Sequence, residues 1–273
     1  MTLTTNGEVG EPTRRDVRHT THPLERTTKV GDVQYRGRVR TRHCVPNARS
    51  MTTVSDLALL TLDPTTGARR LGSYGEIMLG GAALNDLLLA GRLDVTGEGK
   101  KARVLVVDQT PVGIAYLDQA LARLSRQRKP RRAADAVTRL GKKLPRAAYE
   151  ALAGDGVLEA RSAKVLGLFP TTRYAVRPEA RRDELADGVR AVLLGEREPD
   201  ERLGPLAALL GAGGQVKRVV PKGRRREAAK RAKALTEGVW ASEAVRAAVK
   251  ASEDAVMVAV MAATAASTAG GAS

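Results

Sequence analysis

Twelve consecutive residues near the C-terminus, from Ala255 to Ala266, carry no charge, and this run limits the architectures open to the chain. A helix needs roughly 20 predominantly apolar residues to cross a membrane, so the run is too short to span one. It belongs to a helical pattern that starts near Val239 and is dominated by small and apolar side chains. Helices that are apolar on every side usually lie at the centre of a bundle. The sequence therefore predicts a buried central helix over residues 239–266.

Hydrophobic periodicity predicts that most of the chain after residue 50 is helical. Apolar residues recur every three to four positions over residues 54–62, 74–90, 114–128, 133–140 and 145–153, and again beyond residue 178. Ser55 or Asp56 is the expected N-cap of the first of these helices. In the second, the small residues Gly80 and Gly81 allow another helix to approach closely.

Two short pairs of strands complete the prediction. One pair is expected at residues 93–95 and 103–107, and the other is a hairpin with strands at 157–160 and 164–169, separated by Arg161–Ala163. The predicted fold class is therefore mostly α: a helical bundle with surrounding amphipathic helices and a short hydrophobic β-hairpin.

The first 50 residues have a different character from the rest. They are rich in Thr, Arg and Pro, show no helical or strand period and contain few large apolar side chains. Such a segment cannot bury enough surface to offset its ordering entropy. We expect residues 1–50 to be a disordered basic segment, with the alternative open that Met51 is the true start of the protein. Residues 51–273 are expected to form a single domain.

Residues 51–273 contain no histidine and no cysteine. This removes the commonest general base, the commonest thiol nucleophile and most zinc ligand sets from the part expected to fold. Gly80–Gly81 and Gly213–Gly214 lack the context of a dinucleotide fingerprint, and no phosphate-binding Gly-Lys-Ser/Thr loop occurs. The sequence thus predicts a protein that is not an enzyme and uses no cofactor or metal.

The charge balance points to an anionic partner. Lys and Arg number 46 against 30 Asp and Glu, which gives a net charge of +16. Basic residues gather in four groups: Arg69–Arg70, Arg126–Arg132, Lys142–Lys143 with Arg146, and Lys222–Arg226. The single cysteine cannot form an intrachain disulfide, so a reducing cytosol is the expected compartment.

The predicted hairpin supplies an apolar candidate surface. The run Lys164–Phe169 holds the chain's only phenylalanine and lacks the clean alternation of a strand with one buried face. Either both faces are buried against protein, or one meets lipid or a partner. The candidates for membrane contact or self-association, as a homo-oligomer, are Val165, Leu166, Leu168 and Phe169.

A winged-helix interpretation competes with lipid binding. A helix over residues 145–153 followed by a hairpin that ends at Arg173–Tyr174 has the order of a recognition helix and a wing. The cations at 142, 143 and 146 would then contact phosphates. Few side chains on this helix would read base edges, so nucleic acid is the less favoured partner.

The order of motifs from about Val54 to Ala263 resembles the Golgi phosphoprotein 3 family, including its bacterial members. The resemblance rests on Leu57–Asp63, Ala82–Leu93, Gly156–Leu158, Leu168–Tyr174 and Val256–Ala263. It implies a mostly helical domain that attaches peripherally to membranes by recognising phosphatidylinositol 4-phosphate. It also implies that the hydrophobic hairpin assists membrane contact and self-association.

In the eukaryotic members of that family, one tryptophan and three arginines form the headgroup pocket. Counted from the shared motifs, the tryptophan position falls near Leu71 and the arginine positions fall at Gly80, Lys142 and Pro145. Lys142 is the only cation at a matching position, and Arg70, Lys143 and Arg146 are the cations adjoining the others. The predicted headgroup site therefore consists of Lys142, Lys143, Arg146 and Arg70, on a cytoplasmic protein that associates with the membrane surface.

Overall fold

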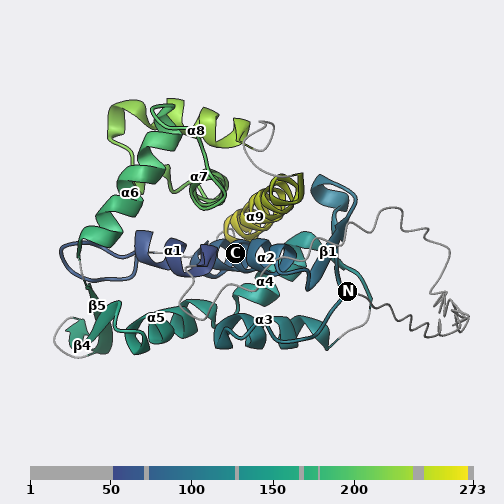
Figure 1. The fold of residues 1–273 in the computed structure, drawn as a ribbon, viewed down its shortest axis with the longest axis horizontal. Coiled ribbons are helices and arrows are strands. Elements are labelled where there is room, and N and C mark those ends of the chain that lie inside the picture. The colour runs from purple at the N-terminus through teal and green to yellow at the C-terminus, as the bar shows by residue number, and fades with distance from the viewer. Residues whose placement is uncertain are drawn as a thin grey trace, which may run out of the picture. The chain divides into compact units, whose positions relative to one another are not determined.

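The computed structural model describes residues 52–70, 74–126, 129–165, 169–177, 179–235 and 243–269. Within these ranges the chain is mainly helical with small antiparallel strand pairs, which confirms the predicted fold class (Figure 1). The α-helices are α1 Thr53–Leu60, α2 Gly75–Leu89, α3 Ala115–Ser125, α4 Ala133–Gly141, α5 Leu144–Gly154, α6 Glu179–Leu194, α7 Leu203–Ala212, α8 Arg225–Ala234 and α9 Glu243–Ala269. Short 3-10 turns occur at η2 Gly99–Lys101, η3 Val216–Arg218 and η4 Lys222–Arg224.

The strands form two separate sheets. In the first, β2 Arg103–Val106 pairs antiparallel with both β1 Leu93–Thr96 and β3 Arg131–Arg132. In the second, β4 Leu158–Val165 pairs antiparallel with β5 Phe169–Val176. The prediction of strands at 93–95 and 103–107 is confirmed, whereas the two-residue strand β3 is too short to leave a pattern in the sequence.

Helix α1 starts earlier than its sequence predicts. The Thr52 hydroxyl accepts a hydrogen bond from the Ser55 N–H at 3.0 Å, and the Thr52 N–H donates to the Ser55 hydroxyl at 2.9 Å. These reciprocal bonds form a capping box, so Thr52 is the N-cap. The expectation of Ser55 or Asp56 as N-cap was wrong because Ser55 is the third residue of the helix and serves as the partner of the cap.

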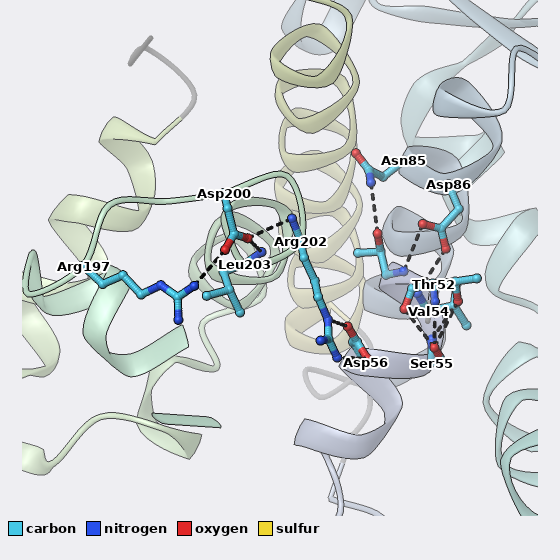
Figure 2. Close-up of polar contacts among 11 residues, drawn as sticks. Thr52, Val54, Ser55, Asp56, Asn85, Asp86, Arg197, Asp200, Arg202 and Leu203 are labelled. Atoms are coloured by element: carbon cyan, nitrogen blue, oxygen red, sulfur yellow. Dashed lines mark hydrogen bonds and ion pairs between the residues drawn. The ribbon is translucent and has the colours of Figure 1, made fainter. Parts of the chain in front are cut away.

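Two further N–H groups at the start of α1 are satisfied by a side chain of α2. The Asp86 carboxylate accepts hydrogen bonds from Thr53 at 3.0 Å and from Val54 at 3.1 Å (Figure 2). The first N–H groups of a helix have no partner within it, so a carboxylate placed there stabilises the helix start. This contact fixes α1 against α2 at one end.

Helix α2 packs against α1, α4, α7 and α9, and its two glycines set the spacing of these helices. A Cβ added to Gly81 would lie 2.3 Å from Cγ2 of Val256 in α9, and one added to Gly80 would lie 2.0 Å from the carbonyl oxygen of Val137 in α4. Real Cβ atoms do not approach that closely. The prediction that Gly80 and Gly81 allow close helix packing is therefore confirmed.

The long last helix is central over only part of its length. Side chains from Val249 to Ala259 are largely buried, and α9 contacts α2, α4 and α7. Beyond this point most residues are exposed, and Met261 keeps 50% of its surface accessible. The expectation of burial through residue 266 was wrong, because residues 261, 262 and 264–266 are exposed although they are uncharged.

The hairpin is longer than expected and turns elsewhere. Leu158 pairs with Val176 at one end and Val165 pairs with Phe169 at the other, so Arg161–Ala163 lies within β4 and pairs with Thr171–Arg173. The predicted turn at 161–163 was therefore wrong. Arg161 and Ser162 are polar and Ala163 is small, as turn residues often are, so the sequence alone does not distinguish this stretch of strand from a turn.

Candidate functional site

The turn between α4 and α5 carries two of the predicted headgroup residues and is docked on the first turn of α2. A Cβ added to Gly141, the last residue of α4, would lie 1.8 Å from the carbonyl oxygen of Glu76, so only glycine fits there. Two residues later the Lys143 N–H donates to Glu76 Oε1 at 3.0 Å. These contacts fix the turn, and the side chains of Lys142 and Lys143 are exposed on it.

Lys143 has a backbone conformation that is costly for a lysine. Its φ of 62° lies in the left-handed region, and it is the only residue other than glycine with positive φ in the described part of the chain. Non-glycine residues pay about 1–2 kcal/mol in this conformation. A glycine would satisfy the turn better, so the side chain at this position is not explained by stability.

Arg146 lies one turn further along α5 and is already paired. Its Nε lies 2.7 Å from Oε1 of Glu150, and this hydrogen bond raises the pKa of the Arg146 guanidinium. Both side chains are exposed. Because Arg146 and Glu150 neutralise each other, Arg146 contributes less to the positive potential than Lys142 and Lys143, whose side chains have no ion pair with any other described residue.

Arg70 is also engaged by a carboxylate. Its Nη2 lies 2.6 Å from Oδ2 of Asp63, while 58% of the Arg70 side chain stays exposed. Hydrogen bonds from Thr66 are the main cause of the lowered pKa of Asp63, and Arg70 lowers it further. Asp63 therefore stays ionised. A phosphate that bound to Arg70 would have to compete with the Asp63 carboxylate for its guanidinium.

Arg218 in η3 is a cation near this site that the sequence analysis did not single out. Burial is the main cause of its lowered pKa, and the positive charge of Arg70 is the second. Its Nε donates to Oε1 of Gln215 at 2.9 Å. The sequence held no signal for this neighbour, because the two arginines lie far apart in the chain and are brought together only by folding.

Tyr149 marks the inner side of the same region. Burial raises the pKa of its hydroxyl to about 12, against hydrogen bonding from Thr61 and the charges of Arg69 and Arg218. The hydroxyl thus stays protonated and lies 2.9 Å from Thr61 Oγ1. It is part of the core beneath the basic surface and not a titrating group.

The positions matched to the family's headgroup pocket differ in whether they could place a charged side chain at the surface. Gly80 is buried against α4, where no side chain fits, so an arginine is excluded there in this arrangement of helices. Pro145 is the second residue of α5 and is partly buried. Leu71 lies outside the described residues. Lys142 is therefore the one matched position that is both charged and exposed.

Two of the four apolar candidates of the hairpin are described: Val165 and Phe169 form the last pair of the ladder. Leu166 and Leu168 lie outside the described residues. The opposite end is anchored, because Leu158 and Tyr174 are buried and the Tyr174 ring stacks on Tyr149 with centroids 5.2 Å apart. Eight-residue strands place the tip roughly 23 Å from the first pair.

Two further properties concern the described residues. No helix among them is both long enough and apolar enough to cross a membrane. The same residues hold no cluster of three or more His, Cys, Asp or Glu side chains arranged to bind a metal ion.

Comparison with known proteins places the chain in a family. No curated protein sequence gives a match. The family model described as Golgi phosphoprotein 3 (GPP34) matches residues 54–252, which covers most of the chain and all of the site described above. The chain therefore belongs to the Golgi phosphoprotein 3 family.

Proposed function

We propose that this protein is a non-enzymatic, cytoplasmic, peripheral membrane protein that binds anionic phospholipid headgroups at the α4–α5 turn. The observation that carries the proposal is the conformation of Lys143, an exposed lysine held at a φ of 62° beside exposed Lys142. Strained residues of this kind concentrate at functional sites. Family membership supports phosphatidylinositol 4-phosphate as one headgroup to test.

The side chains of the site would attract a phosphate by charge rather than recognise its shape. A lysine is a compact point charge, whereas an arginine forks over two phosphate oxygens. Each Lys or Arg near an anionic bilayer contributes about 1 kcal/mol, and this contribution falls off with salt. With Lys142 and Lys143 unpaired and Arg70 and Arg146 shared with carboxylates, we expect salt-sensitive binding with weak discrimination between phosphorylated headgroups.

The hairpin tip is the second contact in this proposal. Val165, Leu166, Leu168 and Phe169 would touch acyl chains or a second copy of the chain. Apolar insertion would add a component of binding that salt does not weaken. Charge at the turn and apolar surface at the tip are thus separable in experiment.

Flotation of the full chain with vesicles tests the proposal. The vesicles contain phosphatidylcholine alone, phosphatidylcholine with phosphatidylserine, or phosphatidylcholine with a few mol% of phosphatidylinositol 4-phosphate. The Lys142→Glu/Lys143→Glu variant should lose flotation with both anionic compositions. The matched control, Lys100→Glu/Lys101→Glu, makes the same charge change at two exposed lysines of η2 and should float like the wild type. Failure of the wild type to float with either anionic composition would refute the proposal.

A further inference from the structure

The segment from η3 to the end of α8 is the most basic part of the described chain. Residues 217–234 contain nine Lys and Arg and one acidic residue, Glu227. This excess is half of the net charge of the protein. Neither the fold nor the proposed headgroup site uses most of it.

Besides Arg218, whose Nε donates to Gln215, three of these arginines have structural partners. Arg224 is held by ion pairs to Glu196 and Glu227, at 2.6 and 3.0 Å. Arg225 donates to the carbonyl oxygen of Val220 at 3.1 Å, and Arg231 donates to that of Val192 at 3.0 Å. These residues close the turn before α8 and fasten α8 to the end of α6.

The other cations of interest form a ridge, which we define as Lys222, Arg226 and Lys230. They follow one another at intervals of four residues, and all three are exposed. No side-chain hydrogen bond or ion pair engages any of them within the described residues. Two of them lie on one face of α8, about 6 Å apart along its axis.

Helix stability does not account for the ridge. Arg226 lies in the first turn of α8, where the helix dipole disfavours a positive charge. Arg226 and Lys230 are like charges at i and i+4, which also destabilise a helix. A solvated helix could carry glutamate at these positions with better local energetics, so the charge itself is the feature to explain.

The described surroundings of the ridge argue against two kinds of partner. The exposed uncharged residues described beside it are Pro221, Gly223, Ala229 and Ala234, so the described residues offer no large apolar or aromatic side chain there as an anchor. Protein interfaces depend on such anchors and are depleted in lysine at their centres. Single-stranded nucleic acid is bound largely by base stacking on aromatic rings, and the residues described beside the ridge include none.

The position of the ridge argues against the bilayer of the proposed headgroup site. Helix α8 packs on α6 and α7, whereas α5 packs on α1, α2 and the hairpin. In Figure 1, α8 lies along the top and α5 along the bottom, with α1 and α2 between them. A bilayer resting against the α5 side would have α1 and α2 between it and α8.

We propose that the Lys222, Arg226 and Lys230 ridge binds the phosphate backbone of duplex DNA without sequence preference. A stiff duplex presents a regular line of phosphates that exposed lysine and arginine side chains neutralise with release of counterions. Such contacts position a protein on DNA and need no base readout. This proposal is independent of lipid binding, because the two sites share no residue.

Fluorescence anisotropy with a labelled duplex of mixed sequence tests it, using the full chain at about 50 mM salt and again at about 200 mM. The ridge variant is Lys222→Glu/Arg226→Glu/Lys230→Glu. The control is Lys100→Glu/Lys101→Glu/Arg103→Glu, which makes the same charge change at exposed residues of η2 and β2. Phosphatidylserine vesicles are tested in parallel, and thermal melting checks that each variant folds.

The ridge variant should bind duplex DNA at least about tenfold more weakly than the control, while both float with vesicles like the wild type. A Gln triple variant at the same three positions should lower the slope of log Kd against log salt by about 2 to 3, as expected for three lost phosphate contacts. Equal DNA affinity of the ridge and control variants would overturn the proposal. So would undetectable binding by the wild type, or a ridge variant that loses vesicle flotation while keeping DNA binding.

Discussion

Arg202 forms a bidentate ion pair with the carboxylate of Asp56: its Nε donates to Oδ2 at 2.6 Å, and its Nη2 donates to Oδ1 at 3.1 Å (Figure 2). Asp56 belongs to the first turn of α1 and its side chain is 1% exposed, whereas Arg202 is the residue before α7 and is 48% exposed. The pair joins the start of α1 to the start of α7. It also places a negative charge where the α1 dipole favours one.

Truncation of Arg202 should therefore destabilise the fold. Arg202→Ala leaves the buried Asp56 carboxylate without its forked donor, and we expect a loss of about 2 kcal/mol in the free energy of unfolding. Arg202→Lys should recover part of this loss, because a lysine supplies charge but cannot fork. Urea unfolding measures both. A loss below about 0.5 kcal/mol for Arg202→Ala would show that the exposed half of the pair is fully screened.

Asp86 should make stability depend on pH in a specific direction. Burial raises the pKa of this carboxyl from 3.8 to about 6, against the hydrogen bonds from Thr53 and Val54 that lower it. The folded protein thus holds a proton on Asp86 more tightly than the unfolded chain does. The resulting contribution to stability is full below about pH 4 and is lost as the pH rises through 6, with a magnitude of up to about 3 kcal/mol.

An Asp86→Asn variant isolates this effect because it does not titrate. Carboxyls with lowered pKa values, such as Asp108 and Glu227, give stability the opposite trend, but they are common to both proteins and cancel in the difference. Urea unfolding at several pH values between 4 and 7 should show the wild type losing stability relative to the variant as the pH rises. A difference that does not change with pH would contradict the assignment.

Gly80 should tolerate no side chain. A Cβ there would lie 2.0 Å from the backbone of α4, so Gly80→Ala must push two packed helices apart. We expect a loss of at least about 2 kcal/mol, although alanine is the better helix former. Gly154→Ala is the matched control: Gly154 ends α5 with nothing within 4 Å of the added Cβ, and its replacement should be neutral or gain up to about 1 kcal/mol. Equal melting temperatures for the two variants would rule out the close contact.

These cases also show which structural features could be predicted from the sequence. The close approach at Gly80 and Gly81 was predictable, because paired small residues on an apolar helix usually mark the place where a neighbouring helix comes close. The cap of α1 was misplaced by three or four residues, since Thr52, Ser55 and Asp56 are all good caps and only the folded backbone decides between them. The hairpin turn was misplaced because Arg161–Ala163 is polar and small, as turn residues often are.

The site was predictable in part, for a physical reason. Charged groups of the candidate site that are near in sequence, such as Lys142 and Lys143, are recognisable as one cluster. Their pairing with carboxylates is less visible, and the Asp63 partner of Arg70 follows from the fold of the loop after α1. Arg218 reaches the same region only through packing of η3, so no local pattern reports it.

The hairpin tip should be separable from the fold. Leu158 and Tyr174 anchor the other end of the ladder, so Leu168→Ser/Phe169→Ser should leave the unfolding free energy within about 0.5 kcal/mol of the wild type. Vesicle flotation, or self-association measured by analytical ultracentrifugation, should weaken. A large loss of stability would instead show that these residues are part of the core.

Lys143→Gly should separate stability from binding at the α4–α5 turn. Glycine adopts a φ of 62° without a steric penalty and keeps the N–H that donates to Glu76, so the variant should gain about 0.5–1 kcal/mol in the free energy of unfolding. It also removes one of two unpaired lysines, so vesicle flotation should weaken and its salt dependence should become shallower. Urea unfolding and flotation of the same preparation measure the two effects together. A variant that is more stable and floats as well as the wild type would show that the lysine serves neither the turn nor the membrane. A gain in stability together with weaker flotation would instead explain why this turn holds a residue that its backbone disfavours.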